Sequence, residues 1–353
     1  MSLRGAGRSA SIIACGLVLV SGWGSSATRA QGAIDVVWVS GPIYMFAGAG
    51  GNVTASIGSD GVLLVDSGEE AMSAAVLDAI RGVQRQLADA VRPTPRGGGA
   101  EGRSTVVEAR SRLAPPKPVR YIINTSAAPE HTGGNQRLST SGVTFTGGNV
   151  AGQLSDAGEG AAIYAHEQVM RRMVDLDLPF AMLPTSTYYQ DHTKLSHFFN
   201  GEGIRMVHMP AARSDGDTIV QFTRSDVIAT GDLFSQTGYP VIDLGAGGSI
   251  DGILEALNDI LDMAIPEFRT EGGTMIVPGH GRLSDSADVG YYRDMLTIVR
   301  DNVRTMMDRG LTLAQVKAAR PTKAYDRRFG SDSGPWTTDM FVEAVYRSLA
   351  GTP

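Results

Sequence analysis

Four short polar segments of the sequence carry side chains that could do chemistry, and each follows an apolar run of strand type. They are Val65-Asp66-Ser67-Gly68, the stretch from Asn124 to Asn135, Gly231-Asp232-Leu233-Phe234 and Pro278-Gly279-His280-Gly281. Loops that follow strands often carry the residues that bind or react. Carboxylates and imidazoles at several strand ends form the O and N ligand set that zinc and similar metals prefer. A lone Asp after a strand more often caps a turn, so the indication of a metal site rests on the combination.

The composition restricts both the metal site and the class of protein. The 353 residues include six histidines and a single cysteine, Cys15, so neither a Cys-rich metal site nor an internal disulfide can form. With 42% hydrophobic residues and a formal net charge of −6, the chain has the composition of a globular protein. Its mildly acidic balance gives no indication of a nucleic-acid partner, and we expect a small-molecule substrate or ligand.

The first 30 residues have the three parts of a secretory signal peptide. The parts are a basic start with Arg4 and Arg8, an apolar run at 12–20 and mostly small residues at 26–30. We therefore expect cleavage near Ala30 and a periplasmic or secreted mature protein. Removal takes away three arginines and no acidic residue, which changes the net charge from −6 to −9.

Two alternatives to a cleaved signal peptide stay open. A membrane anchor is disfavoured because the apolar run is roughly half of the ~20 residues that a spanning helix needs. A lipoprotein signal is the second alternative, since residues 12–16 around Cys15 loosely resemble a lipobox, although the apolar stretch before Cys15 is short. After cleavage we expect no stable membrane span.

Apolar runs predict strands in two groups. The first group is 36–39, 43–46, 52–57, 62–65 and 119–123, and the second is 195–199, 204–209, 218–222, 227–229 and 274–277, with a further short strand near 143–145. Helices are predicted near 72–83, 166–174, 250–263 and 289–306 and in two later segments, with capping boxes at Ser67/Glu70 and Thr312/Gln315. Two strand-rich halves, each closed by helices, predict an α/β fold arranged as a four-layer αββα sandwich.

The pattern also predicts the domain organisation. We expect one domain over residues 31–284, interrupted at about 91–118 by a segment dominated by Pro and Gly. Residues 285–353 are expected to form a helical extension packed on that domain, because their apolar residues recur at spacings of 3 and 4.

In their order along the chain, these segments resemble the metallo-β-lactamase superfamily. The resemblance rests on Asn52-Val53-Thr54, Asp66-Ser67-Gly68, residues 121–125 and 130–135, 163–167, 209–217, 229–234 and 277–281. It covers most of the chain from about Val36 to His280, and so many matches in the expected order are specific for the fold. The resemblance implies an αββα sandwich whose loops hold metal ions, in a family that acts on lactams, thioesters, lactones, phosphodiesters and sulfur compounds.

The same resemblance implies that half of the metal centre is missing. Ser126 and Ala128 stand where the family's His-x-His-x-Asp-His signature has its first two histidines, and Arg213 replaces its next metal histidine. The remaining positions are filled by Glu130 for the signature's Asp, His131 for its last His, Asp232 for the later bridging Asp and His280 for the final His.

The sequence therefore keeps candidate ligands for only one metal position. Ala128 has no donor atom, a Ser126 hydroxyl is a poor zinc ligand, and Arg213 keeps its positive charge. The candidate ligands at the other position are Glu130, His131, Asp232 and His280. Four ligands are enough for one zinc ion, although the extra methylene of Glu130 shifts its oxygens by about a bond length.

Two functions of different classes stay open. In the first, the protein is a mononuclear zinc hydrolase acting on an ester, thioester or lactam-like bond, with Asp232 at the metal and Arg213 steadying the developing oxyanion. In the second, it is a metal-free, catalytically impaired binding or regulatory module in which Arg213 neutralises Glu130 or Asp232. The cofactor is accordingly one zinc ion or none, and the oligomeric state is not indicated.

Two further residues have roles that the sequence leaves open. In the family, the carboxylate at the position of Asp66 supports the metal loop by hydrogen bonds, but a simple turn at a helix start explains Asp66 almost as well. We interpret His166 as a structural or pocket-wall residue rather than a ligand.

Overall fold

The computed structural model describes residues 33–90, 116–143, 160–265 and 273–351. The predicted signal peptide and nearly all of the predicted insertion at 91–118 lie outside these residues. The strand predicted near 143–145 falls at the end of a described range, and Val143 itself is not in a strand. The described residues group as one unit.

The first sheet contains seven strands from the described residues, in the order β1 to β7. Their bounds are β1 (Asp35–Ser40), β2 (Ile43–Ala49), β3 (Gly51–Gly58), β4 (Gly61–Val65), β5 (Val119–Ile123), β6 (Ala162–His166) and β7 (Ser186–Tyr188). Neighbours are antiparallel from β1 to β4 and parallel from β4 to β7. The loops after β4, β5 and β6 therefore leave from the same edge, where sheets of this kind bind ligands.

The second sheet contains five strands of the described chain, in the order β12-β11-β10-β9-β8. Their bounds are β8 (His192–Lys194), β9 (Ile204–Met209), β10 (Asp217–Phe222), β11 (Val227–Ala229) and β12 (Met275–Val277). Only the pair of β11 and β12 is parallel. That pair brings the loops after β11 and β12 to one edge as well.

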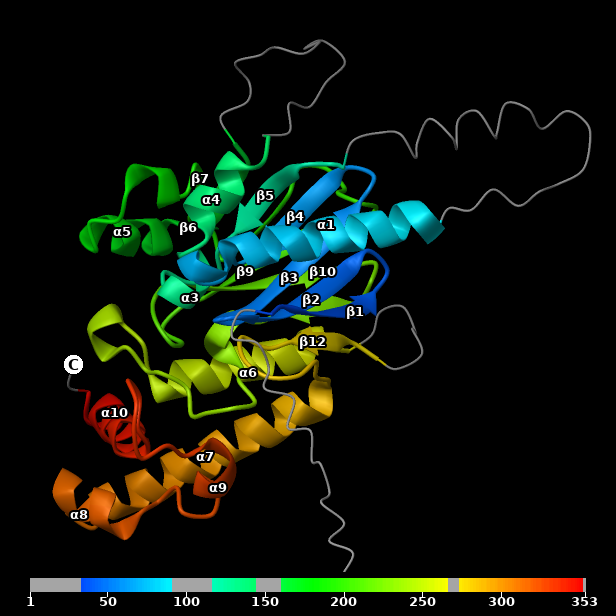
Figure 1. Cartoon of the computed structure of the whole chain (residues 1–353). Helices are drawn as coiled ribbons and strands as arrows, with labels where there is room; N and C mark the ends of the chain where they lie inside the picture. Colours follow the sequence, from blue (N-terminus) through cyan, green and yellow to red (C-terminus); the bar gives the residue numbers. More distant parts are fainter. Residues whose placement is uncertain (1–32, 91–115, 144–159, 266–272, 352–353) are drawn as a thin grey trace, which may run out of the picture. The chain divides into compact units, whose positions relative to one another are not determined.

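The two sheets face each other and helices cover their outer faces (Figure 1). In β4, Leu63 and Val65 belong to the apolar cluster between the sheets, whereas Val62 and Leu64 face α1 (Ser73–Ala90) and α4 (Asn135–Thr140). This two-sided burial explains why β4 is a continuous apolar run. On the second sheet, α6 (Ile250–Met263) and α7 (Ser286–Asp308) form the outer layer. The predicted αββα arrangement is confirmed.

The C-terminal helices share their apolar cluster with the second sheet. They are α7, α8 (Leu313–Ala319), α9 (Asp326–Phe329) and α10 (Thr338–Ala350). The apolar residues of α7 at spacings of 3 and 4, from Val289 to Val303, are buried against α6 and α10. The capping box of Thr312 and Gln315 is confirmed at the start of α8. Among helices in the described ranges, none is both long and apolar enough to cross a bilayer.

Two local predictions are wrong. Ser67 and Glu70 form no capping box, because the Ser67 hydroxyl donates to the His131 carbonyl and a 3-10 helix, η1 (Glu70–Met72), precedes α1. The strand predicted at 195–199 lies instead at β8, three residues earlier, and only an isolated bridge joins Phe199 to Glu202. In both places tertiary hydrogen bonds outweigh the local pattern.

The remaining short helices surround the loops that follow the strands. They are α3 (Pro129–Thr132), α5 (Glu167–Asp175), η2 (Phe180–Met182), η3 (Gly231–Leu233) and η4 (Leu244–Ala246). Two of them, α3 and η3, carry side chains that the sequence singled out as candidate ligands.

Candidate metal centre

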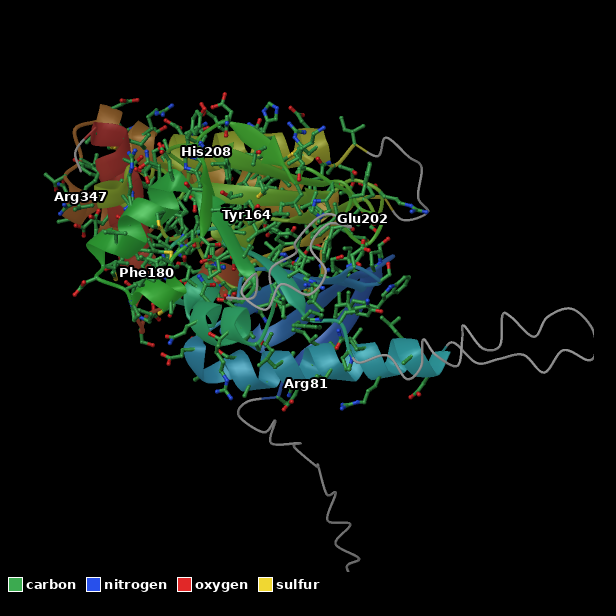
Figure 2. The ribbon with its side chains drawn as sticks, turned by 90° about the horizontal axis from the view of Figure 1, so that it is seen from above. Arg81, Tyr164, Phe180, Glu202, His208 and Arg347 are labelled. Atoms are coloured by element: carbon green, nitrogen blue, oxygen red, sulfur yellow. The ribbon has the colours of Figure 1, made fainter. Side chains whose placement is uncertain are left out.

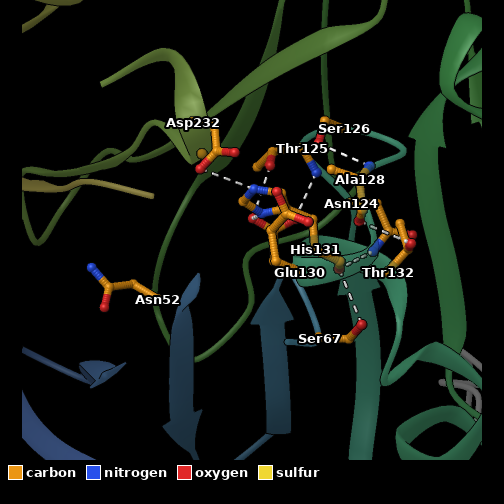
Figure 3. Close-up of polar contacts among 12 residues, drawn as sticks. Asn52, Ser67, Asn124, Thr125, Ser126, Ala128, Glu130, His131, Thr132 and Asp232 are labelled. Carbon is orange, nitrogen blue, oxygen red and sulfur yellow. Dashed lines mark hydrogen bonds and ion pairs between the residues drawn. The ribbon is translucent and has the colours of Figure 1, made fainter. Parts of the chain in front are cut away.

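Loops from both sheets meet at the edge where β4, β5, β11 and β12 end. Asp66 follows β4, His131 lies in α3 after β5, Asp232 lies in η3 after β11, and His280 follows β12. Asn52 of β3 fixes the last of these loops, because its side-chain amide donates to the carbonyls of Pro278 and Gly281 at 2.9 and 3.0 Å. The four segments singled out in the sequence therefore converge: His280 contacts Asp232, and Figure 3 shows Ser67, His131 and Asp232 of the other three.

Asp66 contacts His131 at Nδ1, the ring nitrogen that faces away from Asp232. Its Oδ2 lies 2.7 Å from Nδ1 of the buried His131 and accepts a hydrogen bond from the Thr125 hydroxyl at 2.8 Å, while its Oδ1 accepts one from the Thr125 amide, also at 2.8 Å. An Nδ1–H donated to Asp66 leaves Nε2 of His131 free to act as a ligand. The interpretation of Asp66 as a support of the loop is thus favoured over a simple turn. Gly134 allows the close packing, since a Cβ there would collide with the Ser67 carbonyl oxygen.

Asp232 lies at the centre of the site. Its Oδ1 is 3.1 Å from Nε2 of His131 and 3.2 Å from Nε2 of His280. Nevertheless, His131 Nε2 and Asp232 Oδ1 are buried without a hydrogen bond of acceptable geometry. The atoms are close but do not point at each other, and ligands around one tetrahedral zinc are separated by roughly 3.3 Å.

Three of the four predicted ligands form one compact group. Glu130, Asp232 and His280 each offer an atom within 4.8 Å of the others, and His131 adjoins the group through its contact with Asp232. The His280 and Glu130 side chains are 34% and 27% exposed, so the group opens toward solvent on their side. The donor set and the orphaned buried atoms fit one divalent ion.

Arg213 occupies the other side of the site. Its Nη1 lies 3.1 Å from Oδ2 of Asp232, and its Nη2 lies 3.7 Å from Oε1 of Glu130. Burial acts to lower the pKa of Arg213, but Asp232, Asp217 and other nearby carboxylates outweigh burial and raise that pKa. The guanidinium is therefore a fixed cation in the centre.

Comparisons with solved structures support the fold that the site requires. The inverting sec-alkylsulfatase Pisa1 from Pseudomonas sp. matches 89% of this chain with a TM-score of 0.56 and 14% identity, and a double mutant of the same sulfatase matches 90% with a TM-score of 0.58 and 14% identity. The DIM-1 metallo-β-lactamase exposed to ceftazidime matches 75% of this chain and 97% of its own, with a TM-score of 0.50 and 12% identity.

The chain has the metallo-β-lactamase fold. It spans about half the length of the alkylsulfatase, 50% in both forms. No protein-family model matches the sequence, and no curated protein does.

The three residues that the resemblance places at the family's first metal position lie together. Ser126, Ala128 and Arg213 line one pocket of about 300 Å³ beside the centre. Ser126 Oγ is 3.3 Å from the Ala128 amide, and Ala128 offers no donor atom. The pocket is thus a space next to the centre rather than a second ligand cage.

Carboxylates outnumber the fixed cations at the centre. Glu130 and Asp232 contact Arg213, Asp217 lies next to it, and Asp66 contacts His131. With neutral imidazoles the centre carries excess negative charge, which favours a bound cation. Without metal, Asp66 and Asp232 outweigh the effect of burial and raise the pKa of His131, while His131 and Arg213 hold the pKa of Asp232 well below its usual range against burial.

Asp217 supports the site and was missed in the sequence, where it belongs to a segment typical of a turn. It is buried at the start of β10 and accepts a hydrogen bond from the Ser214 amide at 2.5 Å, next to Arg213. Burial raises the pKa of Asp217 to about 6, opposed by Arg213 and the bonds from Ser214. Asp217 therefore fixes the loop that carries Arg213.

His166 is stacked on His208, which Figure 2 labels, with ring centroids 3.7 Å apart. Burial and His208 lower the pKa of His166 to about 4 from an ordinary value near 6.5.

The low pKa of His166 predicts a loss of stability in acid. Between pH 6.5 and 4 the unfolded chain binds the proton at His166 more readily than the folded chain does. The free energy of unfolding should therefore fall by about 1–3 kcal/mol over this range and should not change through His166 above pH 6.5. Urea unfolding at several pH values should show this loss in the wild type and a smaller loss in His166→Asn. An equal loss of unfolding free energy in the wild type and in His166→Asn would contradict the assignment of the effect to His166.

Proposed function

We propose that this chain is a hydrolase dependent on a single divalent metal ion, held by Glu130, His131, Asp232 and His280. The observation that carries the proposal is Oδ1 of Asp232, which has an imidazole Nε2 on either side at 3.1 and 3.2 Å. Buried atoms this close and without aligned hydrogen bonds are explained by a common ligand target.

The residues of the chain have separate tasks in such a reaction. When bound, the ion supplies Lewis-acid activation of water near neutral pH. Asp66 holds the His131 ring in the tautomer that leaves Nε2 unprotonated. Arg213 lines the pocket beside Asp232 with a permanent positive charge, which can stabilise negative charge that develops on a substrate oxygen there.

The substrate class follows from the site and from the fold. The pocket beside Arg213 holds about 300 Å³, which suits the acyl part of a small molecule. The alkylsulfatase and the metallo-β-lactamase that share the fold are consistent with cleavage of an ester, thioester or lactam-like bond. We also propose, from residues 1–30, that the protein works in the periplasm or outside the cell.

A second candidate function has its own supporting observation. The ion pair of Arg213 with Asp232, 3.1 Å long and largely buried, neutralises the carboxylate without any metal. A metal-free binding or regulatory module would need this pair for stability rather than for catalysis.

Metal content separates the two functions. Protein purified without chelator should contain about one equivalent of zinc, iron or manganese by mass spectrometry, and His280→Ala should lose most of it together with esterase, thioesterase or lactamase turnover. His280 suits this test because its side chain is 34% exposed, so we expect its removal to leave the fold intact. Asp232→Asn should behave like His280→Ala, while the matched variant of an exposed aspartate, Asp308→Asn, should retain both metal and turnover. Less than about a tenth of an equivalent, with no recovery on adding metal, would refute the hydrolase.

A further inference from the structure

A groove of about 620 Å³ lies at the β8 edge of the second sheet, away from the metal centre. We call it the edge groove. It is lined among others by His192, Lys194, His197, Phe198, Arg205 and Thr223. No Asp or Glu of the described residues lines it, although the chain as a whole is acidic.

Two cations in the edge groove face each other across strands. Lys194 of β8 is paired in register with Arg205 of β9, so both side chains leave the same face of the sheet. Like charges directly opposite each other destabilise a sheet. In the part of the chain that the structure describes, no carboxylate oxygen lies within 4.0 Å of either charged group.

The buried Glu202, next to the strand that carries Arg205, makes its contacts elsewhere. Glu202, labelled in Figure 2, precedes β9 and is 1% exposed. Its carboxylate accepts hydrogen bonds from the amides of Arg224 and Ser225, both at 3.0 Å, and from the Ser225 hydroxyl at 2.5 Å. It forms no ion pair with Lys194 or Arg205 among the described residues.

The groove also has an exposed aromatic wall and an apolar floor. Phe198 is 73% exposed, and its ring lies over Gly203, where an added Cβ would be 3.4 Å from the ring. Leu195 and Ile204 are buried beneath, at 8% and 1% exposure. The ring and the two cations line the same groove, so one ligand can contact all three.

We propose that the edge groove binds an organic anion, with one carboxylate, sulfonate or sulfate group on an aryl or alkyl body. The anionic group would lie between Lys194 and Arg205, relieving their repulsion, and the body would lie against Phe198.

The competing explanation is that Lys194 only protects a sheet edge from pairing with another chain. Arg205 also lines a neighbouring groove with Asp226, Asp259 and Asp262, which could balance part of its charge.

Calorimetric titration of the full mature protein with 2-naphthoate tests the proposal. We expect saturable binding that weakens as salt is raised, weaker binding of inorganic sulfate and weaker binding of uncharged 2-naphthalenemethanol. Lys194→Gln and Arg205→Gln should each weaken naphthoate binding about threefold and together about tenfold, and Phe198→Ala should weaken it by a similar factor. Lys323→Gln, which removes an exposed charge elsewhere, should change nothing.

Two further measurements separate binding in the edge groove from binding at the metal centre. Naphthoate binding in the edge groove should persist in His280→Ala and in protein treated with chelator, whereas binding lost in both would assign the ligand to the metal centre and refute the proposal. Equal affinity for naphthoate and naphthalenemethanol, or unchanged affinity in the Lys194→Gln/Arg205→Gln variant, would also refute it and leave edge protection as the role of Lys194. Unfolding temperatures of Lys194→Gln and Arg205→Gln should equal or exceed that of the wild type, because each removes the repulsion between these two cations.

Discussion

Replacing Arg213 with methionine is expected to destabilise the metal-free protein by about 3–5 kcal/mol. The Arg213 and Asp232 side chains are only 13% and 11% exposed, so removing the guanidinium leaves a buried carboxylate without its main cation. Asp217, also buried, would lose the charge that opposes the effect of its burial. Urea unfolding in chelator measures the effect.

Zinc should reduce this destabilisation if the centre binds metal. A cation within a few ångströms of the ion disfavours its binding, so Arg213→Met should bind zinc at least about tenfold more tightly than the wild type. Bound zinc stabilises the folded state by mass action, and the gap in unfolding free energy between the two proteins should narrow.

Arg172→Met provides the matched control for both measurements. Arg172 pairs with Asp215 at 2.6 Å, but these side chains are 26% and 41% exposed, so the pair is screened by solvent. Its loss should cost no more than about 1 kcal/mol and should not respond to zinc. If zinc changes the stability of neither wild type nor Arg213→Met, the ion pair is purely structural and the metal-free module is the better function.

The layers of the fold could be predicted because each strand and helix carries its own pattern. The run Val62–Val65 is apolar at every position because both of its faces are buried, and the spacing of 3 and 4 in α7 reflects one buried face. The wrong predictions came from residues with long-range partners. Ser67 has the sequence of a helix cap, but its hydroxyl bonds to the carbonyl of His131, 64 residues away.

The sequence predicts which candidate residues come together, but not which of them form ion pairs. His131, Asp232 and His280 follow strands whose ends must meet, so their convergence followed from the order of the segments. The sequence left open whether Arg213 would pair with Glu130 or Asp232, and the structure has the shorter contact to Asp232. Asp217 could not be found, since an aspartate in a turn segment carries no sign that the fold will bury it.

The combined substitution Ser126→His, Ala128→His and Arg213→His is expected to raise the metal content from one to two equivalents. These three positions line the same pocket, so their new imidazoles would point into one space next to the existing centre. Three imidazoles plus a water complete a tetrahedral zinc site. Mass spectrometry of protein dialysed against zinc gives the stoichiometry, and zinc titration of the apo form gives the affinity of the second site.

Arg213 decides whether this second ion can bind. In Ser126→His/Ala128→His, two imidazoles are present, but the guanidinium still lines the same pocket and lies 3.1 Å from Asp232. We expect the double variant to stay at one equivalent, because a permanent cation cannot be deprotonated to make room for a dication. A triple variant that also remains at one equivalent would show that the loops carrying Ser126 and Arg213 no longer hold ligands in register. The loss of the first metal would then be a property of the backbone and not only of three side chains.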